Sequence, residues 1–174
     1  WNNLSRVGIE SFKYSKYITS FPKGGQLEEI KEWIYSNGIP HKNIYVVPTM
    51  VNNQLPNLIK QADLAVFASR CEGGTNLMAM EALSCGVPTI ASYNTGHKDL
   101  FDLGIKSAIP LKQNLGSVEE GITNCYGGDP ERVWGESDPK ELVRLWIDIM
   151  KSKKDYKSLA IDYAKSMDNL SWRI

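Results

Sequence analysis

The sequence predicts an α/β fold in which helices flank a parallel β-sheet. Short strand-like runs alternate with helical segments through the middle of the chain, a pattern typical of βαβ units. One run, Leu64–Ala68, is apolar throughout, as expected of a strand that is covered on both faces. Glycine turns stand where a strand would lead into a helix, at Gly73-Gly74 and again at Asn94–Gly96. Together these observations predict a Rossmann-like sheet.

The strands are predicted from short β-rich runs that end at prolines, glycines or polar turns. These runs are Ile44–Val47, Leu64–Ala68, Pro88–Ala91 and Ala108–Ile109. Residues 112–137 are rich in turn-forming residues and predict an irregular excursion without regular structure.

The helices are predicted from apolar spacing and end signals. They cover 26–37, 56–62, the segment from the glycine turn to Leu83, 97–103, a segment that begins after Asp138, and a final segment from Tyr156 that ends near Ser171-Trp172. Asp138 is a typical N-cap, and Pro139 suits the first turn of the helix that follows.

Bulk composition restricts the range of functions. The chain has 174 residues, with 20 Lys plus Arg against 20 Asp plus Glu, so it gives no reason to expect a nucleic acid partner. Its cysteines, Cys71, Cys85 and Cys125, are odd in number and lack zinc-ligand spacing, which favours a cytoplasmic compartment. Because the chain opens on Trp1 without a preceding strand, we expect residues 1–174 to be a single-domain fragment of a longer protein, with C-terminal helices over 138–172.

The glycine turn after Leu64–Ala68 is the strongest candidate for a ligand site. Gly73 and Gly74 allow a close backbone approach, and Thr75 or Asn76 is a natural N-cap for the next helix. The amides at such a helix start suit a phosphate oxygen. Two carboxylates, Glu72 before the turn and Glu81 within the helix, flank these amides.

These residues also have simpler interpretations. A glycine turn between a strand and a helix occurs in many α/β proteins, and Glu81 could simply face solvent. Its apolar neighbours in sequence favour instead an acid that needs a partner, such as ribose hydroxyls. His97 is either a ligand contact or an ordinary residue at a helix start. Cys71 and Cys85 are best explained by packing, and no spacing predicts a metal site.

The run from Glu72 to Pro88, followed by Ser92-x-x-Thr95-Gly96-His97, resembles the donor-binding half of group 1 retaining glycosyltransferases. The signature of that family is Glu-Gly-Phe-Gly-Leu-Pro-x-x-Glu-Ala-Met-Ala-x-Gly-x-Pro. The resemblance is good over about residues 40–110. One departure is clear: the two glutamates of the family are separated by seven residues, whereas eight stand between Glu72 and Glu81.

The resemblance implies a role for each matching residue. Glu72 is expected to lie near the donor sugar as the catalytic carboxylate, and Glu81 is expected to bind the nucleotide ribose. The remaining donor-binding candidates are Gly73, Gly74, Thr75, Asn76, Leu77, Thr95, Gly96 and His97. The loop at Val47–Val51 is a weaker candidate for contact with the nucleotide base.

The resemblance also implies an architecture and a reaction. Such enzymes have the two-domain GT-B fold and transfer a sugar from a nucleotide-diphosphate donor, with retention at the anomeric carbon and without a metal or other cofactor. We therefore expect a nucleotide sugar as donor and a glycan, lipid or protein as acceptor. The N-terminal acceptor domain and the basic pair that neutralises the diphosphate do not match any part of this chain. The 174 residues alone should therefore be inactive, and the cytoplasm or the cytoplasmic face of a membrane is the expected location.

Two other functions remain open at this point. A non-catalytic nucleotide-sugar or glycan-binding module could keep the same fold without turnover. A sugar-nucleotide epimerase of the same architecture would need further acid–base residues around the sugar, and only His97 offers itself.

Overall fold

The computed structural model describes residues 32, 35, 36, 38, 53–72, 74, 76–117 and 133–167. The helices within these ranges are α3 (Leu55–Ile59), α4 (Leu77–Ser84), α5 (Lys98–Asp102), α7 (Pro139–Lys151) and α8 (Lys153–Met167), with a 3₁₀ turn η3 (Thr95–His97). The strands are β1 (Ala65–Phe67), β2 (Thr89–Ser92), β3 (Ala108–Leu111), β4 (Gln113–Ser117) and β5 (Val133–Ser137).

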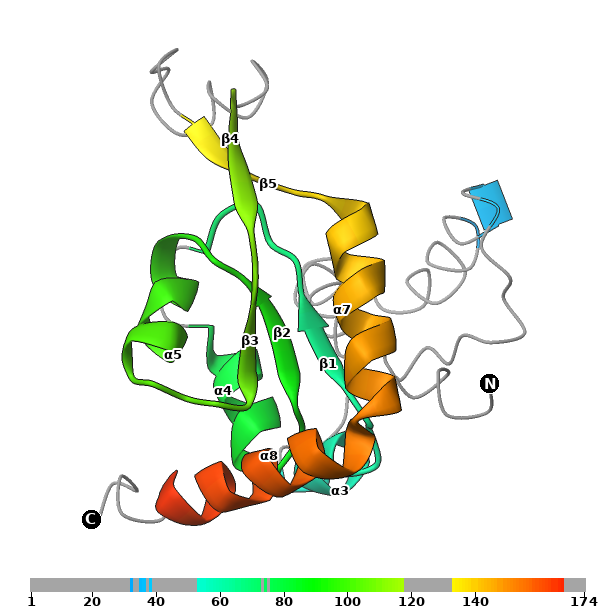
Figure 1. The fold of residues 1–174 in the computed structure, drawn as a ribbon, viewed down its shortest axis with the longest axis vertical. Coiled ribbons are helices and arrows are strands. Elements are labelled where there is room, and N and C mark those ends of the chain that lie inside the picture. The colour runs from blue at the N-terminus through cyan, green and yellow to red at the C-terminus, as the bar shows by residue number, and fades with distance from the viewer. Residues whose placement is uncertain are drawn as a thin grey trace.

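The central sheet is parallel and has the strand order β1-β2-β3. Val66 pairs with Ile90 and Ile90 with Ile109, so the apolar residues stand in line across the sheet. The carboxyl ends of the three strands point toward the β4–β5 pair (Figure 1). This confirms the predicted α/β fold with a parallel, Rossmann-like sheet flanked by helices, and places both glycine turns at one edge of it.

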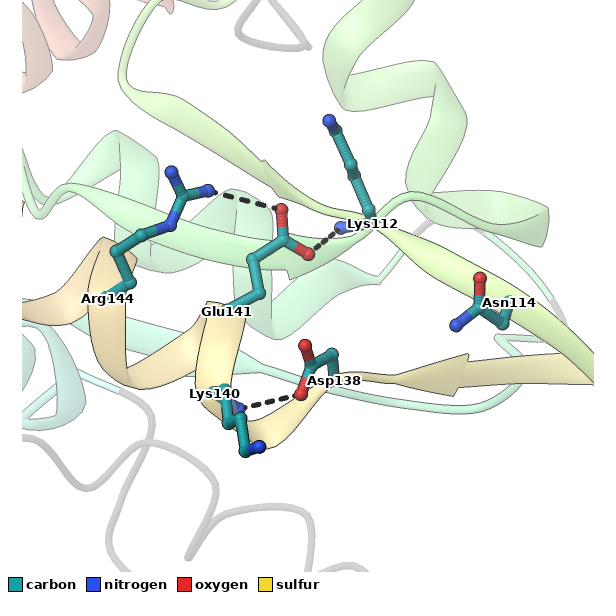
Figure 2. A pocket seen from close by; sticks show the side chains of 6 residues that line it. All are labelled: Lys112, Asn114, Asp138, Lys140, Glu141 and Arg144. Atoms are coloured by element: carbon teal, nitrogen blue, oxygen red, sulfur yellow. Dashed lines mark hydrogen bonds and ion pairs between the residues drawn. The ribbon is translucent and has the colours of Figure 1, made fainter.

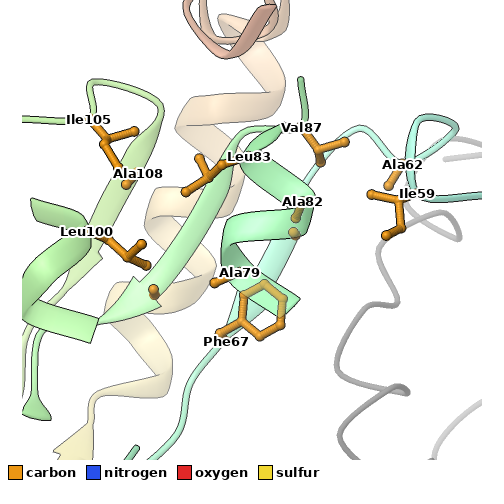
Figure 3. Close-up of a cluster of buried hydrophobic side chains, with 12 residues drawn as sticks. Ile59, Ala62, Phe67, Ala79, Ala82, Leu83, Val87, Leu100, Ile105 and Ala108 are labelled. Carbon is orange, nitrogen blue, oxygen red and sulfur yellow. The ribbon is translucent and has the colours of Figure 1, made fainter. Parts of the chain in front are cut away.

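Helices cover both faces of this sheet, as its continuous apolar strands require. Alternate residues of the first strand point to opposite faces. Ala65 and Phe67 enter a core with α4 and α5, and Leu64 and Val66 enter a second core with α7. Figure 3 shows the first core, where the buried side chains of α4 face Phe67 and Leu100.

Two helix starts are capped as the sequence predicts. Asn76 caps α4, its side-chain Oδ1 accepting the Ala79 N–H at 3.1 Å. Asp138 caps α7, its Oδ1 accepting the Lys140 N–H at 2.9 Å, with Pro139 in the first turn. Each cap satisfies a backbone donor that the helix itself cannot pair.

The expectation of irregular structure over 112–137 is wrong at both ends of that segment. Gln113–Ser117 and Val133–Ser137 form an antiparallel ladder in which Leu115 is opposite Gly135. Neither strand carries the apolar alternation that marks a half-buried strand, because five of their ten residues are polar and two are glycines. Backbone pairing, which leaves little trace in the sequence, holds this ladder together.

Other differences are small. The helix predicted from residue 156 begins three residues earlier, at Lys153, and the strand predicted at 108–109 extends to Leu111. Tyr35 and Ser36 are helical, in agreement with the predicted helix over 26–37. The rest of that helix, the strand at 44–47 and residues 168–174 lie outside the described residues. Within the ranges given above, no helix is long and apolar enough to cross a membrane.

Candidate functional site

The turns that follow β1 and β2 meet at the carboxyl edge of the sheet. The Glu72 N–H donates to Oγ1 of Thr95 at 2.7 Å, and the Gly96 N–H donates to the Glu72 carbonyl at 3.3 Å. These two bonds join residues more than twenty positions apart in the sequence. They bring Glu72 together with the Thr95-Gly96-His97 segment, as the position of both turns in a parallel sheet predicts.

The contact between the two turns leaves no room for a side chain. A Cβ on Gly96 would overlap the backbone carbonyl of Gly74, whereas a Cβ on Gly74 would meet nothing within 4 Å. Thr95, beside this contact, has a φ of 35°, which is unusual for a β-branched residue. Position 96 therefore requires glycine, because the backbones of the two turns approach too closely for a Cβ.

Asn76 connects the helix start to the side chains of Glu72 and His97. Its amide is 7% exposed, and its Oδ1 caps α4. Its Nδ2 lies 3.1 Å from Oε2 of Glu72 and 2.9 Å from Nε2 of His97. One buried amide thus links a helix N-terminus, a carboxylate and an imidazole.

His97 is the most deeply buried residue of this network. Its side chain is completely buried, and its Nε2 is 3.9 Å from Oε2 of Glu72. The Glu72 side chain is 22% exposed, so it is the member of this pair that reaches the surface. In this arrangement His97 is joined to the site surface through Asn76 and Glu72.

Asn94 is a site residue that the sequence did not single out. Its buried Nδ2 donates to the carbonyls of Ser69 and Arg70, both at 2.8 Å, and lies 3.2 Å from Oε1 of Gln113. It therefore fixes the path of the chain just before Glu72. Its position two residues after a buried strand, at the start of the second turn, was the available signal.

The β4–β5 ladder is fastened to the same loop. The Gly135 N–H donates to the Arg70 carbonyl at 2.9 Å. The Arg70 guanidinium lies 4.6 Å from the centre of the Trp134 ring, and its Nε is 2.9 Å from Oε1 of Glu136. The segment expected to be irregular thus forms one wall beside the candidate site.

Glu81 is not buried. On α4 the buried side chains are Ala79, Ala82 and Leu83, and Glu81 points away from them and is exposed. The inference that an apolar environment would force this acid to find a partner is therefore wrong, because its apolar neighbours in sequence face the core. The alternative interpretation, in which Glu81 faces solvent, is correct for this structure.

The remaining candidates divide into exposed and undescribed residues. Gly74 is exposed, and Leu77, the first residue of α4, is 69% exposed. Both stand at the surface next to the helix start. Gly73, Thr75 and the loop Val47–Val51 lie outside the described residues.

A known protein family matches more than half of the chain. Residues 7–124 match the model of the family described as glycosyl transferases group 1, a span that includes every candidate site residue. The chain belongs to this family. No curated protein matches the chain.

Membership gives this group 1 glycosyltransferase a general reaction, the transfer of a sugar from a donor to an acceptor. The matched span ends before β5, α7 and α8, so the helix α7 that covers the second core and the β5 wall of the site are not part of the match.

The glycosyltransferase also has a polar hollow of about 420 Å³ at the start of α7 (Figure 2). Its lining residues are Lys112, Asn114, Asp138, Lys140, Glu141 and Arg144. Both of its carboxylates have structural partners. Asp138 caps α7, and Glu141 accepts the Lys112 N–H at 3.1 Å and lies 3.7 Å from Nη2 of Arg144. We therefore interpret this hollow as a structural feature of the junction between β3 and α7, not as a ligand site.

Across the residues that the structure describes, no group of three or more His, Cys, Asp or Glu side chains is arranged to hold an ion.

Proposed function

We propose that this chain is the donor-binding domain of a retaining glycosyltransferase with the GT-B architecture, and that its donor is a nucleotide-diphosphate sugar. The observation that carries the proposal is the meeting of the Glu72 carboxylate with the capped N-terminus of α4, both held by Asn76. A carboxylate suits sugar hydroxyls and helix-start amides suit a diphosphate, so one small surface serves both parts of such a donor.

In this proposal the diphosphate lies against the first turn of α4. The cap takes the Ala79 N–H, and the earlier amides, those of Leu77 and Met78, have no acceptor within the helix. Exposure of Leu77 and Gly74 leaves the approach to these amides open. The helix dipole adds a favourable field for the phosphate charge.

The two glutamates take different parts of the donor. Glu72, anchored by Asn76 and partly exposed, is placed to accept hydroxyl groups of the transferred sugar. Glu81 is exposed on α4 and is assigned to the ribose hydroxyls, a role that rests on the family resemblance. Thr95 and Gly96 are assigned to the donor because their turn is hydrogen-bonded to Glu72.

The proposed contribution to catalysis is electrostatic. Transfer requires the bond between the anomeric carbon and the diphosphate oxygen to break, and fixed amide dipoles stabilise the charge that develops on the departing diphosphate. We propose that this needs no metal ion. The 174 residues alone are expected to bind donor weakly and to transfer little sugar, because such enzymes work by closing two domains over the donor.

The cellular location is also a proposal. Cys71 and Cys85 are both free thiols in the structure. Free thiols are typical of a reducing compartment, which supports a cytoplasmic enzyme or one at the cytoplasmic face of a membrane.

Thermal denaturation of the chain with UDP, GDP, ADP and CDP tests the proposal. Ligand at about 100 times its Kd adds about 2.7 kcal/mol to the free energy of unfolding, enough to raise Tm by several degrees. We expect a shift with one nucleotide, reduced in Glu81→Ala. The matched control is Asp148→Ala, which removes an exposed carboxylate from the opposite layer.

Each result has a defined meaning. A shift that Glu81→Ala reduces and Asp148→Ala keeps supports the donor site and identifies the base. Absence of a shift with all four nucleotides at millimolar concentration contradicts nucleotide binding by this chain.

A further inference from the structure

The orientation of the Asn76 amide is fixed by the helix that it caps. Its Oδ1 accepts the Ala79 N–H at 3.1 Å, so this atom must be the oxygen. A flipped amide would place an N–H₂ group against that N–H. The cap therefore fixes the other atom, Nδ2, which lies between Glu72 and His97, as a donor of two hydrogen bonds.

This orientation fixes the state of His97. Since Nδ2 of Asn76 only donates, the Nε2 atom of His97, 2.9 Å away, has to accept and carries a lone pair. The tautomer that this geometry assigns is a neutral imidazole with its proton on Nδ1, an atom that is itself buried. By the same argument, Oε2 of Glu72 accepts the second N–H of Asn76.

We propose that His97 is a positioning residue, which holds the Glu72 carboxylate in place through Asn76. Its ring is completely buried, so it acts on the donor indirectly and not as the contact that the sequence suggested. With one N–H of Asn76 bound to His97, the other is directed to Oε2 of Glu72. The part of this inference that concerns the donor rests on the proposed function, but the state of the imidazole does not.

The inference predicts a difference between the sugar and the nucleotide. Glu72 is assigned to the sugar, whereas the diphosphate is assigned to the amides of α4. Loss of the His97 acceptor should therefore weaken binding of a nucleotide sugar more than binding of the corresponding nucleoside diphosphate. A purely structural role for His97 would weaken both equally or neither.

Nitrogen-15 NMR of the imidazoles tests the first part. The chain has only two histidines, His41 and His97, so His41→Gln assigns the spectrum. We expect Nε2 of His97 to be the unprotonated nitrogen at neutral pH. In Asn76→Asp the cap is kept but an oxygen replaces the donor, so Nε2 should become protonated. A protonated Nε2 in the wild-type chain overturns the proposal.

Binding measurements test the second part. His97→Gln supplies a side-chain oxygen that can accept from Asn76, whereas His97→Leu has a similar bulk and no acceptor. UDP-glucose, GDP-mannose and ADP-glucose are titrated beside UDP, GDP and ADP. For His97→Leu we expect a loss of about three- to tenfold in nucleotide-sugar affinity, the equivalent of one net hydrogen bond. His97→Gln should bind within about twofold of the wild-type chain.

The outcomes separate this inference from the proposed function. Equal affinities of His97→Leu and the wild-type chain overturn the positioning role, as does an equal loss for sugar nucleotides and free diphosphates. A wild-type chain that binds none of the six compounds overturns the proposed function and the donor part of the inference together. The NMR result then decides alone whether Asn76 holds His97 as described.

Discussion

The Cα of Gly96 lies against the backbone carbonyl of Gly74, so the turns after β1 and β2 touch with no side chain between them. This contact supports the bond from the Gly96 N–H to the Glu72 carbonyl. It joins two segments that the sequence presents as separate motifs, and the candidate site depends on it.

Gly96→Ala should be strongly destabilising, because its methyl group would overlap the Gly74 carbonyl and force the two turns apart. We expect a loss of about 1–3 kcal/mol in the free energy of unfolding, typical of overpacking at a rigid position. Urea denaturation measures it. Gly74→Ala is the control, since its methyl group would point into open space; equal losses for both variants would contradict the described contact.

Asn76→Ala should lower stability through the helix cap and the buried network together. Loss of an N-cap side chain costs about 0.5–2 kcal/mol, and the acceptors left on Glu72 and His97 add to that. The free energy of unfolding, measured in urea, provides the test. Asn114→Ala, at an exposed position on β4, should change it by less than about 0.5 kcal/mol. A loss for Asn76→Ala no larger than this control would argue against the cap.

Truncation of two leucines of α4 should change the free energy of unfolding by very different amounts. Leu83 is completely buried in the core with Phe67, and Leu83→Ala should cost about 2–5 kcal/mol. Leu77 is 69% exposed, so Leu77→Ala should stay within about 0.5 kcal/mol of the wild-type chain. Chemical denaturation of both variants tests which face of α4 is buried, and similar losses would reverse the assignment.

Cys85 should be alkylated more slowly than Cys71. Burial raises the pKa of the Cys85 thiol, and the Glu81 carboxylate adds to this while Lys60 and Lys157 oppose it. A raised pKa lowers the thiolate fraction, and the thiolate is the reactive form. Iodoacetamide modification followed by mass spectrometry, across a range of pH, gives both rates, with the exposed Cys71 as reference. Faster reaction at Cys85 would contradict its environment.

The raised pKa of Cys85 also makes the free energy of unfolding depend on pH. The folded chain favours the neutral Cys85 thiol, so its burial contributes fully below the pKa of the unfolded thiol. That contribution declines as the pH rises toward the higher folded pKa.

The sequence predicts the central fold well because its signals there are local. The apolar strands, a cap at Thr75 or Asn76 and the Asp138-Pro139 start each depend on a few neighbouring residues. Those within the described residues are confirmed, with Asn76 as the cap. The β4–β5 ladder was missed because its polar strands are held by pairing between segments far apart in the chain.

The candidate site shows the same division. The meeting of Glu72 with Thr95 and Gly96 follows from the topology of a parallel sheet, which brings the turns after β1 and β2 to one edge. The burial of His97 and the exposure of Glu81 depend on which face of a short element packs inward. That choice is made by tertiary contacts, so residue type and spacing could not decide it.

The connection between β5 and α7 has a mechanical consequence. Only Asp138 separates Ser137, the last residue of β5, from Pro139, the first of α7 (Figure 1). Since β5 is bonded to the loop of Arg70 and α7 fills the opposite core, a displacement at the mouth of the site is passed to the far layer through a one-residue joint. We therefore expect that movement of the β5 wall beside Glu72 shifts α7 and changes the packing of Ile149.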